Sequence, residues 1–557
     1  MTTHSFPKLD SENLYFLPLG GSGEIGMNVN LYTYQGSWIM VDLGITFSPR
    51  AGFDIVTPDL SSFLPYKDQL KGLVITHGHE DHLGAVAYLW DQLGCPIYAT
   101  PFTASILKLK AQDWRVDLPL KTVNPGESAH LDPFTIQFLG LTHSIPESQG
   151  LWIQTPVGNI FHTGDWKLDP KPVVGPATNT QDLKALAKNK PVAVICDSTN
   201  VFEKGSSGSE DDVAVCLNET IVGKFPGKRL IFACFASNVA RVSTLMSLAK
   251  KDGRRVVLAG RSLKRFYELA QKSTYVPDHA SVLEEERAGD LSRDETCILA
   301  TGSQGEERAA LSKIAQGRHP HIQLEAGDVV VFSSRIIPGN ELAIFDLQNQ
   351  LARQGVRVIT SKDVPGIHVS GHPHQDELKS LYTWLAPEKA VPVHGEDRHL
   401  IHHAELAKSW GVKETFAPRN GDVIQLFPGT LNKVGQVMSG RRYLEGRRFV
   451  SDHGPVVKDR YRLMTAGSVF LTLVVQDQEI LGYKLSLKGL CDNDKAKKST
   501  LRALKDVIHN TWSRLQNKDQ ESACVQLFEN SIKGYFFPTL KRKPVVHVHM
   551  VFLDDEA

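Results

Sequence analysis

Long apolar runs are missing from this chain of 557 residues. No stretch approaches the roughly 20 consecutive apolar residues that a membrane-spanning helix needs. The opening MTTHSFPKLDSEN lacks a basic start followed by an apolar run, which is the pattern of a secretory signal peptide. We therefore expect a cytoplasmic protein that does not enter a membrane.

Cysteine is scarce, and the chain has no excess of charge of either sign. Its seven cysteines are scattered and form no C-x-x-C pair, which argues against a disulfide framework and against a thiolate zinc site. Lysine and arginine together number 62, as do aspartate and glutamate. The net charge therefore gives no general attraction for nucleic acid, so a polyanionic partner would have to be held by local patches or by metals.

The composition and length are those of a soluble globular protein with several domains. Apolar residues make up 41% and charged residues 22% of the chain, which excludes a disordered or fibrous protein. The first 200 residues read as strands with polar ends, residues 206–363 alternate helices with apolar strands, and polar-ended strands then return. We predict a domain at 206–363 inserted between two parts of another, 1–205 and 364–445, with a small α+β domain at 446–557.

One cluster of polar residues follows the apolar strand KGLVIT. It reads His77-Gly78-His79-Glu80-Asp81-His82. Residues two apart in extended chain face the same way, so His77 and His79 can hold one metal, while the next turn can aim Asp81 and His82 at a second. Imidazole and carboxylate are the ligands that zinc or manganese prefers at an open catalytic site.

Three further polar residues stand just after apolar strands: His143 in LGLTHS, Asp165 in FHTGD and His394 in VPVHGE. This placement lets His143 complete one metal site and His394 the other, with the Asp165 carboxylate bridging both. Taken singly, each of these residues can be explained as a satisfied polar loop residue. His162, three residues before Asp165, is assigned to that second interpretation.

Two metals held in this way predict hydrolysis. At roughly 3.5–4 Å apart they would lower the pKa of a shared water and neutralise charge on phosphoryl oxygens. Phosphoester hydrolysis fits such a site, with Asp81 counted as catalytic as well as a ligand. Amide or thioester hydrolysis would use the same metals, so the cluster alone does not choose the substrate.

These motifs resemble the metallo-β-lactamase superfamily, whose fold is an αββα sandwich with the metals at one edge. The segment His368-Val369-Ser370-Gly371-His372 looks like motif B of the β-CASP nucleases within it. Val393-His394-Gly395-Glu396 looks like motif C, and Asp197 in CDSTN like motif A. The resemblance implies an α/β protein, a metallo-β-lactamase sandwich with an inserted β-CASP α/β domain and a small α+β C-terminal domain.

Within that group the chain resembles the ribonuclease J family along nearly its whole length. The segments that carry this likeness are LPLGGSGEIGMN, CFASN, TGSQGE and IPGNE. The likeness implies an RNA nuclease that depends on two Zn²⁺ or Mn²⁺ ions and acts in RNA decay and maturation. It implies 5′-to-3′ exonuclease activity that favours 5′-monophosphate ends, some endonuclease activity, and a dimer or tetramer formed through the C-terminal region. The sequence departs from the family at Val239-Ala240-Arg241, where a histidine is expected before the arginine.

The resemblance also suggests roles beyond metal binding. His372 is predicted to contact the scissile phosphate and to help protonate the leaving 3′ oxygen, assisted by Asp197. The alternative is that Asp197 only orients His372 or caps a turn. A pocket for the RNA 5′-phosphate needs small residues and exposed backbone N–H groups. Its candidates are His368, Ser370, Gly371, His372, Ser237 and Asn238, the last two being equally well explained as a turn that caps a helix.

Three other functions stay open at this level. A β-CASP nuclease acting on DNA would use the same metals, and only a groove that senses the 2′-hydroxyl would distinguish it. A small-molecule hydrolase of the superfamily is disfavoured, because it needs neither the long insertion nor the Ser-Gly-His motif. A non-catalytic RNA-binding or scaffolding protein would have lost ligands, whereas all seven candidates are present.

Overall fold

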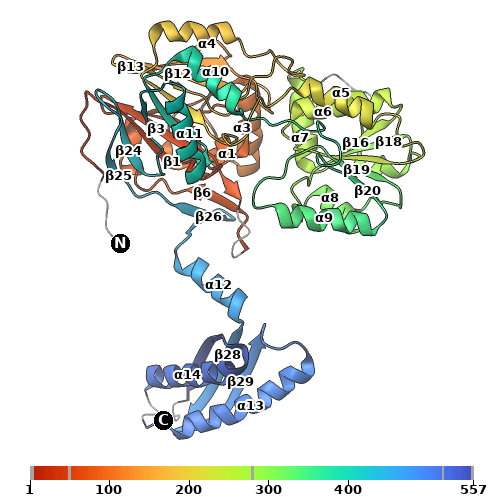
Figure 1. Ribbon diagram of the computed structural model, residues 1–557. Helices are drawn as coiled ribbons and strands as arrows, with labels where there is room; N and C mark the ends of the chain where they lie inside the picture. Colours follow the sequence, from red (N-terminus) through yellow and green to blue (C-terminus); the bar gives the residue numbers. More distant parts are fainter. Residues whose placement is uncertain (1–5, 48–51, 277–281, 517–519, 554–557) are drawn as a thin grey trace. The chain divides into compact units, whose positions relative to one another are not determined.

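The computed structural model of this protein describes residues 6–47, 52–276, 282–516 and 520–553. The chain forms two compact units, residues 1–46 with 57–440 and residues 47–56 with 441–557. Figure 1 shows their elements coloured along the sequence. No helix among the described residues is long and apolar enough to cross a membrane. The seven cysteines, all of them among the described residues, form no disulfide with one another.

The larger unit contains two central β-sheets. The first has eight strands, in the spatial order β25 (Asn432–Gln436), β24 (Asp422–Phe427), β1 (Leu14–Gly20), β3 (Val29–Tyr34), β4 (Ser37–Val41), β7 (Leu70–Val74), β8 (Ile97–Ala99) and β9 (Leu120–Thr122). The second has seven, in the order β10 (Ser128–Leu131), β11 (Phe134–Gly140), β12 (Gln149–Thr155), β13 (Gly158–His162), β14 (Ala193–Asp197), β21 (Lys389–Val393) and β23 (Glu414–Thr415).

The inner faces of these two sheets form one core. Phe16, Tyr32 and Val74 of the first sheet pack with Phe138 and Ile195 of the second, all fully buried. Helices cover the outside: α4 (Thr180–Leu186), α10 (Gln375–Leu385) and α11 (Asp397–Ser409) lie on the second sheet, and α2 (Val86–Leu93) and α3 (Pro101–Trp114) follow strands of the first. The predicted αββα sandwich is confirmed.

A third sheet in the same unit is parallel throughout. Its six strands follow the order β17 (Val282–Leu283), β16 (Arg255–Ala259), β18 (Thr296–Ala300), β15 (Leu230–Ala233), β19 (Val329–Phe332) and β20 (Arg357–Ile359). Its helices are α5 (Glu210–Thr220), α6 (Val239–Lys251), α7 (Arg261–Lys272), α8 (Ala310–Ala315) and α9 (Glu341–Arg353) (Figure 1). The continuous apolar runs of these strands are typical of a parallel sheet buried on both faces.

The smaller unit ends in a compact α+β fold. Strands β29 (Glu479–Lys488), β28 (Ser468–Gln476) and β30 (Val545–Phe552) form a three-stranded sheet, in which β28 is antiparallel to β29 and parallel to β30. Helices α13 (Asp494–Ser513) and α14 (Glu521–Leu540) supply the other half of its core. Helix α12 (Pro455–Ala466) precedes this fold, after the hairpin of β26 (Arg441–Glu445) and β27 (Arg448–Ser451).

The path of the chain between the sheets determines which residues become neighbours. The chain leaves the second sheet at the end of β14, forms the parallel sheet, and returns as β21, which lies directly beside β14. Asp197 pairs in register with Val393, and His394 is the next residue. Because β13, β14 and β21 are parallel, the polar residues at their carboxyl ends meet at one edge of the sandwich.

Candidate metal centre

The His77–His82 segment runs into the short helix α1 (Glu80–Leu83), whose backbone is bonded to residues just before β3 and just after β4. Three main-chain N–H groups from residues 28, 43 and 45 donate to the carbonyl oxygens of Asp81, His82 and Glu80 at 2.7–3.0 Å. Gly44 makes this approach possible, because a Cβ at that position would stand 1.8 Å from the carbonyl oxygen of Asp81. The short helix that carries Asp81 and His82 is therefore held in a fixed position.

Three histidines and one aspartate converge at the first cluster. The Nδ1 atom of His79 lies 3.1 Å from Nε2 of His77 and 3.1 Å from Nε2 of His143. A carboxylate oxygen of Asp165 lies 3.8 Å from each of the latter two nitrogens. The other ring nitrogen of His143, Nδ1, donates to the carbonyl oxygen of Gly371 at 2.6 Å, which directs the Nε2 lone pair toward the cluster.

A second cluster adjoins the first and shares Asp165 with it. Nε2 of His82 lies 3.2 Å from Asp165 Oδ2, and Nε2 of His394 lies 3.1 Å from Asp81 Oδ2. The other carboxylate oxygen of Asp165, Oδ1, is buried and has no hydrogen-bond partner among the described residues. A buried carboxylate oxygen that lacks a hydrogen-bond donor is suited to bind a metal, and the donor set as a whole fits a pair of divalent ions.

Burial and charge divide the five histidines of these clusters into two groups. Burial lowers the pKa of His77 and His143 well below the usual range, and that of His79 to about 4. Burial also acts to lower the pKa of His82 and His394, but the surrounding carboxylates outweigh it. They raise the pKa of His82 well above its usual value and that of His394 to about 10. The first three imidazoles are therefore neutral, the form in which histidine binds a metal.

The structure thus brings all seven predicted ligands together in two groups that share Asp165. A third group of possible donors, Asp165, Asp197, His372 and His394, overlaps them. Its members were predicted as two separate pairs, Asp165 and His394 as metal ligands and Asp197 with His372 as catalytic groups, and the fold brings the two pairs together.

Asp42, which is not among the ligands predicted from the sequence, supports the second cluster. This fully buried residue follows β4 with a positive φ of 64°, and its Oδ2 accepts from Nδ1 of His82 at 2.7 Å. Its Oδ1 accepts from the backbone N–H of Thr76 at 2.8 Å. Burial is the main cause that raises the pKa of Asp42. A signal was present, since Asp42 follows the apolar run WIMV as the predicted ligands follow theirs.

His162 is also buried, behind the metal centre. Its Nδ1 lies 2.8 Å from the hydroxyl oxygen of Tyr32, and burial lowers the pKa of His162 to about 3. A neutral histidine with a hydrogen-bonded partner in the sandwich core agrees with its interpretation as a satisfied polar residue.

Asp197 lies between two histidines at the open side of the centre. Its Oδ2 accepts from Nδ1 of His372 at 2.8 Å, and its Oδ1 lies 3.3 Å from Nδ1 of His394. Oδ1 also accepts from the backbone N–H and the hydroxyl of Thr199, at 2.8 and 2.6 Å. Asp197 therefore caps its own turn and orients His372 at the same time. Burial acts to raise the pKa of Asp197, but the two histidines outweigh it and hold this pKa well below its usual range.

The loop of residues 368–372 joins the metal centre to the parallel-sheet region. Ser370 Oγ accepts from the amide of Asn200 at 2.6 Å and from the backbone N–H of His372 at 3.2 Å. A Cβ at Gly371 would stand 2.9 Å from the ring of His143, so the loop needs glycine for its close approach. Burial lowers the pKa of His368, the first residue of this loop, well below the usual range, which keeps its imidazole neutral.

Asn238 has a structural role at the start of a helix. Its Oδ1 accepts from the backbone N–H of Arg241 and so caps α6. The Arg241 side chain is fully buried and pairs with Glu210 at 2.9 Å, and it also donates to the carbonyl oxygen of Ser333 at 2.8 Å. Ser237 is half-buried. The capping interpretation of Asn238 agrees with this geometry, and a phosphate contact by either residue stays a prediction.

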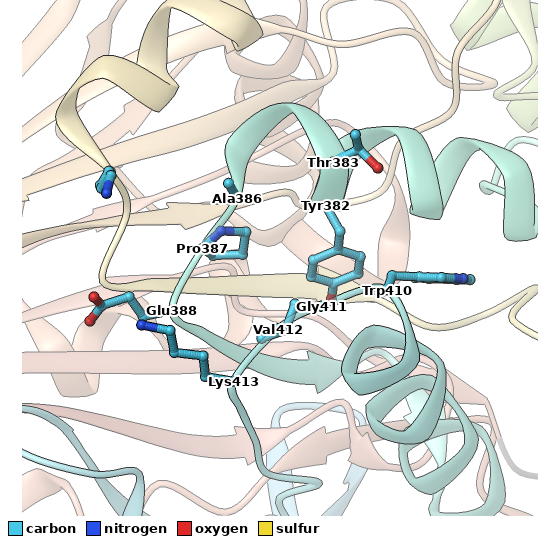
Figure 2. A pocket seen from close by; sticks show the side chains of 10 residues that line it. Tyr382, Thr383, Ala386, Pro387, Glu388, Trp410, Gly411, Val412 and Lys413 are labelled. Atoms are coloured by element: carbon cyan, nitrogen blue, oxygen red, sulfur yellow. The ribbon is translucent and has the colours of Figure 1, made fainter.

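A separate cavity of about 340 Å³ lies at the other end of β21 (Figure 2). Tyr382, Trp410 and Lys413 are among its lining residues; Tyr382 lies in the last turn of α10, and the other two follow α11. Glu388, which immediately precedes β21, also lines it, whereas His394 follows the strand's carboxyl end. The cavity and the metal centre are therefore at opposite ends of the same strand.

Four segments of the chain match models of known protein families. Residues 23–190 match the metallo-beta-lactamase superfamily, and 227–351 match the ribonuclease J beta-CASP domain. Residues 363–418 match the Zn-dependent metallo-hydrolase RNA specificity domain, and 455–552 match the ribonuclease J C-terminal domain.

Similar proteins were found among curated sequences and solved structures. Ribonuclease J of Sinorhizobium meliloti is 39% identical over 503 residues, which cover 88% of this chain and 89% of the relative. Ribonuclease J of Corynebacterium glutamicum is 34% identical over 549 residues, covering 97% of this chain and 76% of the relative. A crystal structure of a protein of unknown function from Enterococcus faecalis V583 matches with a TM-score of 0.53 at 15% identity, covering 74% of this chain and 100% of that one, and this likeness concerns the fold alone.

Proposed function

Because this chain belongs to the ribonuclease J family, we propose that it is a 5′-to-3′ exoribonuclease that favours 5′-monophosphate ends and has some endonuclease activity. The chain is a hydrolytic ribonuclease of the metallo-β-lactamase fold, it uses divalent metal, and it binds RNA. The proposal adds direction, end preference and a role in RNA decay and maturation. The observation that carries it is the Asp197–His372 pair, which joins the 368–372 loop to the edge of the two-cluster centre.

Two ions per chain, zinc or manganese, are proposed to occupy the two clusters. His77, His79 and His143 would hold one, Asp81, His82 and His394 the other, and Asp165 would bridge them. When bound, such a pair activates water for attack and neutralises charge that develops on the phosphoryl oxygens. The unpartnered Oδ1 of Asp165 and the neutral imidazoles of the first cluster support this assignment.

His372 is proposed as the general acid of the reaction. Its Nδ1 is bonded to Asp197, so Nε2 is the nitrogen that remains to meet substrate. Burial acts to lower the pKa of His372, but Asp197 and Asp165 outweigh it and raise this pKa, which favours the protonated form. The proton passes from Nε2 to the 3′ oxygen as the bond from that oxygen to phosphorus breaks and a water oxygen bonds to phosphorus. The products are a nucleotide with a 3′-hydroxyl and an RNA with a new 5′-phosphate.

A 5′-phosphate pocket at the 368–372 loop would make this product the next substrate. Ser370 has its hydroxyl oxygen fixed by two donors, which leaves its own O–H to donate to an anion. His368, Gly371 and His372 complete the proposed pocket on this loop, and Ser237 and Asn238 are its more distant candidates. A neutral His368 would recognise the phosphate by hydrogen bonding.

The proposal extends to assembly and location. We expect a homodimer or homotetramer formed through the C-terminal region, in the cytoplasm. Exposed apolar side chains on the three-stranded sheet support an association there, with Phe470 43% and Leu481 58% exposed. The mass of the protein in solution, compared with that of a chain truncated at residue 440, tests this part.

Time-resolved product analysis on one RNA labelled at its 3′ end tests the activity. The RNA is prepared with a 5′-monophosphate, a 5′-triphosphate or a 5′-hydroxyl, beside the matching DNA, and an Asp81→Ala, His82→Ala double variant serves as control. We expect mononucleotides released fastest from the monophosphorylated RNA and none in the control. Preference for DNA would transfer the assignment to a DNA-acting β-CASP nuclease, and absence of cleavage with metals bound would refute both.

A further inference from the structure

A stack of side chains close to the metal centre has no part in the chemistry described so far. The ring of Phe202 is 44% exposed and lies parallel to the imidazole of His402, with centroids 4.9 Å apart and an interplanar angle of 11°. The guanidinium carbon of Arg398 lies 5.3 Å from the centre of the same ring, and the ring of His399 lies 5.1 Å from it at 59°. We call Phe202, Arg398 and His402 the aromatic stack.

The aromatic stack lies within a few residues of the proposed catalytic groups. Phe202 is five residues after Asp197, which limits their Cα separation to about 17 Å. Arg398 is four residues after His394, in the first turn of α11. His399 lies beside Gly395, the residue after His394, because a Cβ at Gly395 would stand 2.8 Å from the Cβ of His399 and 3.2 Å from that of Ser198.

The loop that carries Phe202 is fixed from both sides. Asn200 donates to Ser370 Oγ at 2.6 Å and to the carbonyl oxygen of His372 at 3.3 Å, and so ties the loop to the proposed phosphate pocket. Arg335, from beyond β19, makes an ion pair with Glu203. An exposed aromatic ring held on a fixed loop loses little conformational entropy when it binds, which favours its use as a contact surface.

The chemistry of the stack suits a nucleobase better than a phosphate. Arg398 is 69% exposed and is planar, and bases stack on guanidinium groups as well as on aromatic rings. Its charge, however, is balanced by Glu396, whose carboxylate lies 3.2 Å from Nε, and Glu405 lies 3.8 Å from His402. The stack therefore offers an aromatic surface without a net positive potential. Grooves that bind the phosphate backbone depend on such a potential.

We propose that Phe202 and Arg398 form a stacking platform for one base of the bound single-stranded RNA, a few nucleotides from the scissile phosphate. The proposal rests on the proposed ribonuclease function and adds a base contact to it. A base placed on the platform holds the strand in register while the terminal nucleotide is cleaved. Since every base has a π-face, the contact strengthens binding without selecting a sequence.

Abasic scanning tests the platform. A 5′-monophosphorylated RNA is made with one abasic nucleotide at each of the first several positions, and KM and kcat are measured for the wild type, Phe202→Leu and Phe202→Trp. We expect one position at which loss of the base raises the wild-type KM by about fivefold or more. Phe202→Leu should raise KM for the complete RNA by a similar factor and remove the sensitivity at that position, because the base then has no ring to stack on. Phe202→Trp should keep both the wild-type KM for the complete RNA and the sensitivity at that position.

Two sets of control variants distinguish stacking from charge attraction and from a nonspecific loss of structure. Arg398→Lys keeps the positive charge but removes the planar guanidinium group. If Arg398 binds the base by stacking, this variant should have the same KM as Arg398→Ala. If Arg398 acts through its charge, the variant should have the KM of the wild type. Phe345→Leu, at a ring of 42% exposure on α9, is the matched control and should leave KM unchanged. The effect of Phe202→Leu should persist between about 50 and 200 mM salt, where a phosphate contact would weaken.

Binding measurements keep this test independent of the proposed activity. The affinity of the same abasic RNAs for the Asp81→Ala variant, with and without Phe202→Leu, gives the platform position even if the direction of degradation differs from that proposed. The platform is refuted if no abasic position weakens binding, if Phe202→Leu leaves the position-dependent loss intact, or if that variant lowers kcat alone. The last result would assign Phe202 to support of the Asp197 loop.

Discussion

Asp42 and Asp197 are both buried aspartates at the end of a strand, and each is hydrogen-bonded to a histidine of the metal centre. Asp42 accepts from one histidine and from the backbone and hydroxyl of Thr76, and burial is the main influence that raises its pKa. Asp197 lies between His372 and His394, and these two groups hold its pKa well below the usual range despite burial.

The difference between the two carboxylates indicates a difference in their roles. Asp42 is on the closed side of the centre, where it can only fix the orientation of His82 toward its metal position. Asp197 is on the side where the His372 side chain is 22% exposed, so it influences both the orientation and the protonation of a group that can reach substrate. The same residue type thus supports a ligand in one place and an acid in the other.

Removal of the acid itself should have the largest effect. We expect His372→Ala to lower kcat about 10²- to 10⁴-fold, the usual contribution of a positioned general acid. Metal content, measured by elemental analysis, should stay at the wild-type level, because His372 is outside the two proposed ligand sets. Loss of metal in this variant would place His372 among the ligands of the third donor group instead.

Asp197→Asn should have the next largest effect and should change the pH profile. His372 acts in its protonated form, so activity is retained below its pKa and lost as the pH rises through it. Asp197 is the first of the causes that raise this pKa, so its removal should move the alkaline limb of kcat to lower pH. Single-turnover rates across pH measure this shift. An unchanged limb would contradict the assignment of the acid.

Asp42→Asn should weaken metal binding by about 10- to 100-fold, as loss of a carboxylate behind a histidine ligand usually does. Activity should therefore return when the metal concentration is raised, and the pH profile should keep its alkaline limb. Titration of activity against Zn²⁺ or Mn²⁺ for Asp42→Asn and Asp197→Asn side by side gives the sharpest contrast, because only the first should be rescued by metal.

The smallest effect is expected at Thr199, whose hydroxyl lies 2.6 Å from both Asp197 Oδ1 and His394 Nδ1. Thr199→Val removes those hydrogen bonds at nearly constant volume, which corresponds to about 0.5–1.5 kcal/mol, or a rate loss of about 2- to 12-fold. Thr383→Val, at the distant cavity, is the matched control, since its hydroxyl bonds only within α10 among the described contacts (Figure 2). Equal losses in both variants would show that the effect is not specific to the centre.

Much of the fold could be predicted from the sequence. The apolar strands with polar ends, and the change to uniformly apolar strands within residues 206–363, correspond to the αββα sandwich and the parallel sheet. The His77–His82 cluster was recognisable because a strand followed by a turn places such neighbours together by local geometry alone. The metal-binding and catalytic roles of these residues stay predictions, as do the domain boundaries.

The sequence by itself determined the contacts that depend on a few consecutive residues: the alternation that points His77 and His79 the same way, and the turn that brings Asp81 and His82 next to them. Only the tertiary structure decided that β14 and β21 lie side by side, so that Asp197 stands beside His394 although nearly 200 residues separate them. It also placed Asp42 behind His82, and the Gly371 carbonyl behind His143. Strand neighbours are chosen by the packing of whole sheets, and that choice leaves no local pattern in the chain.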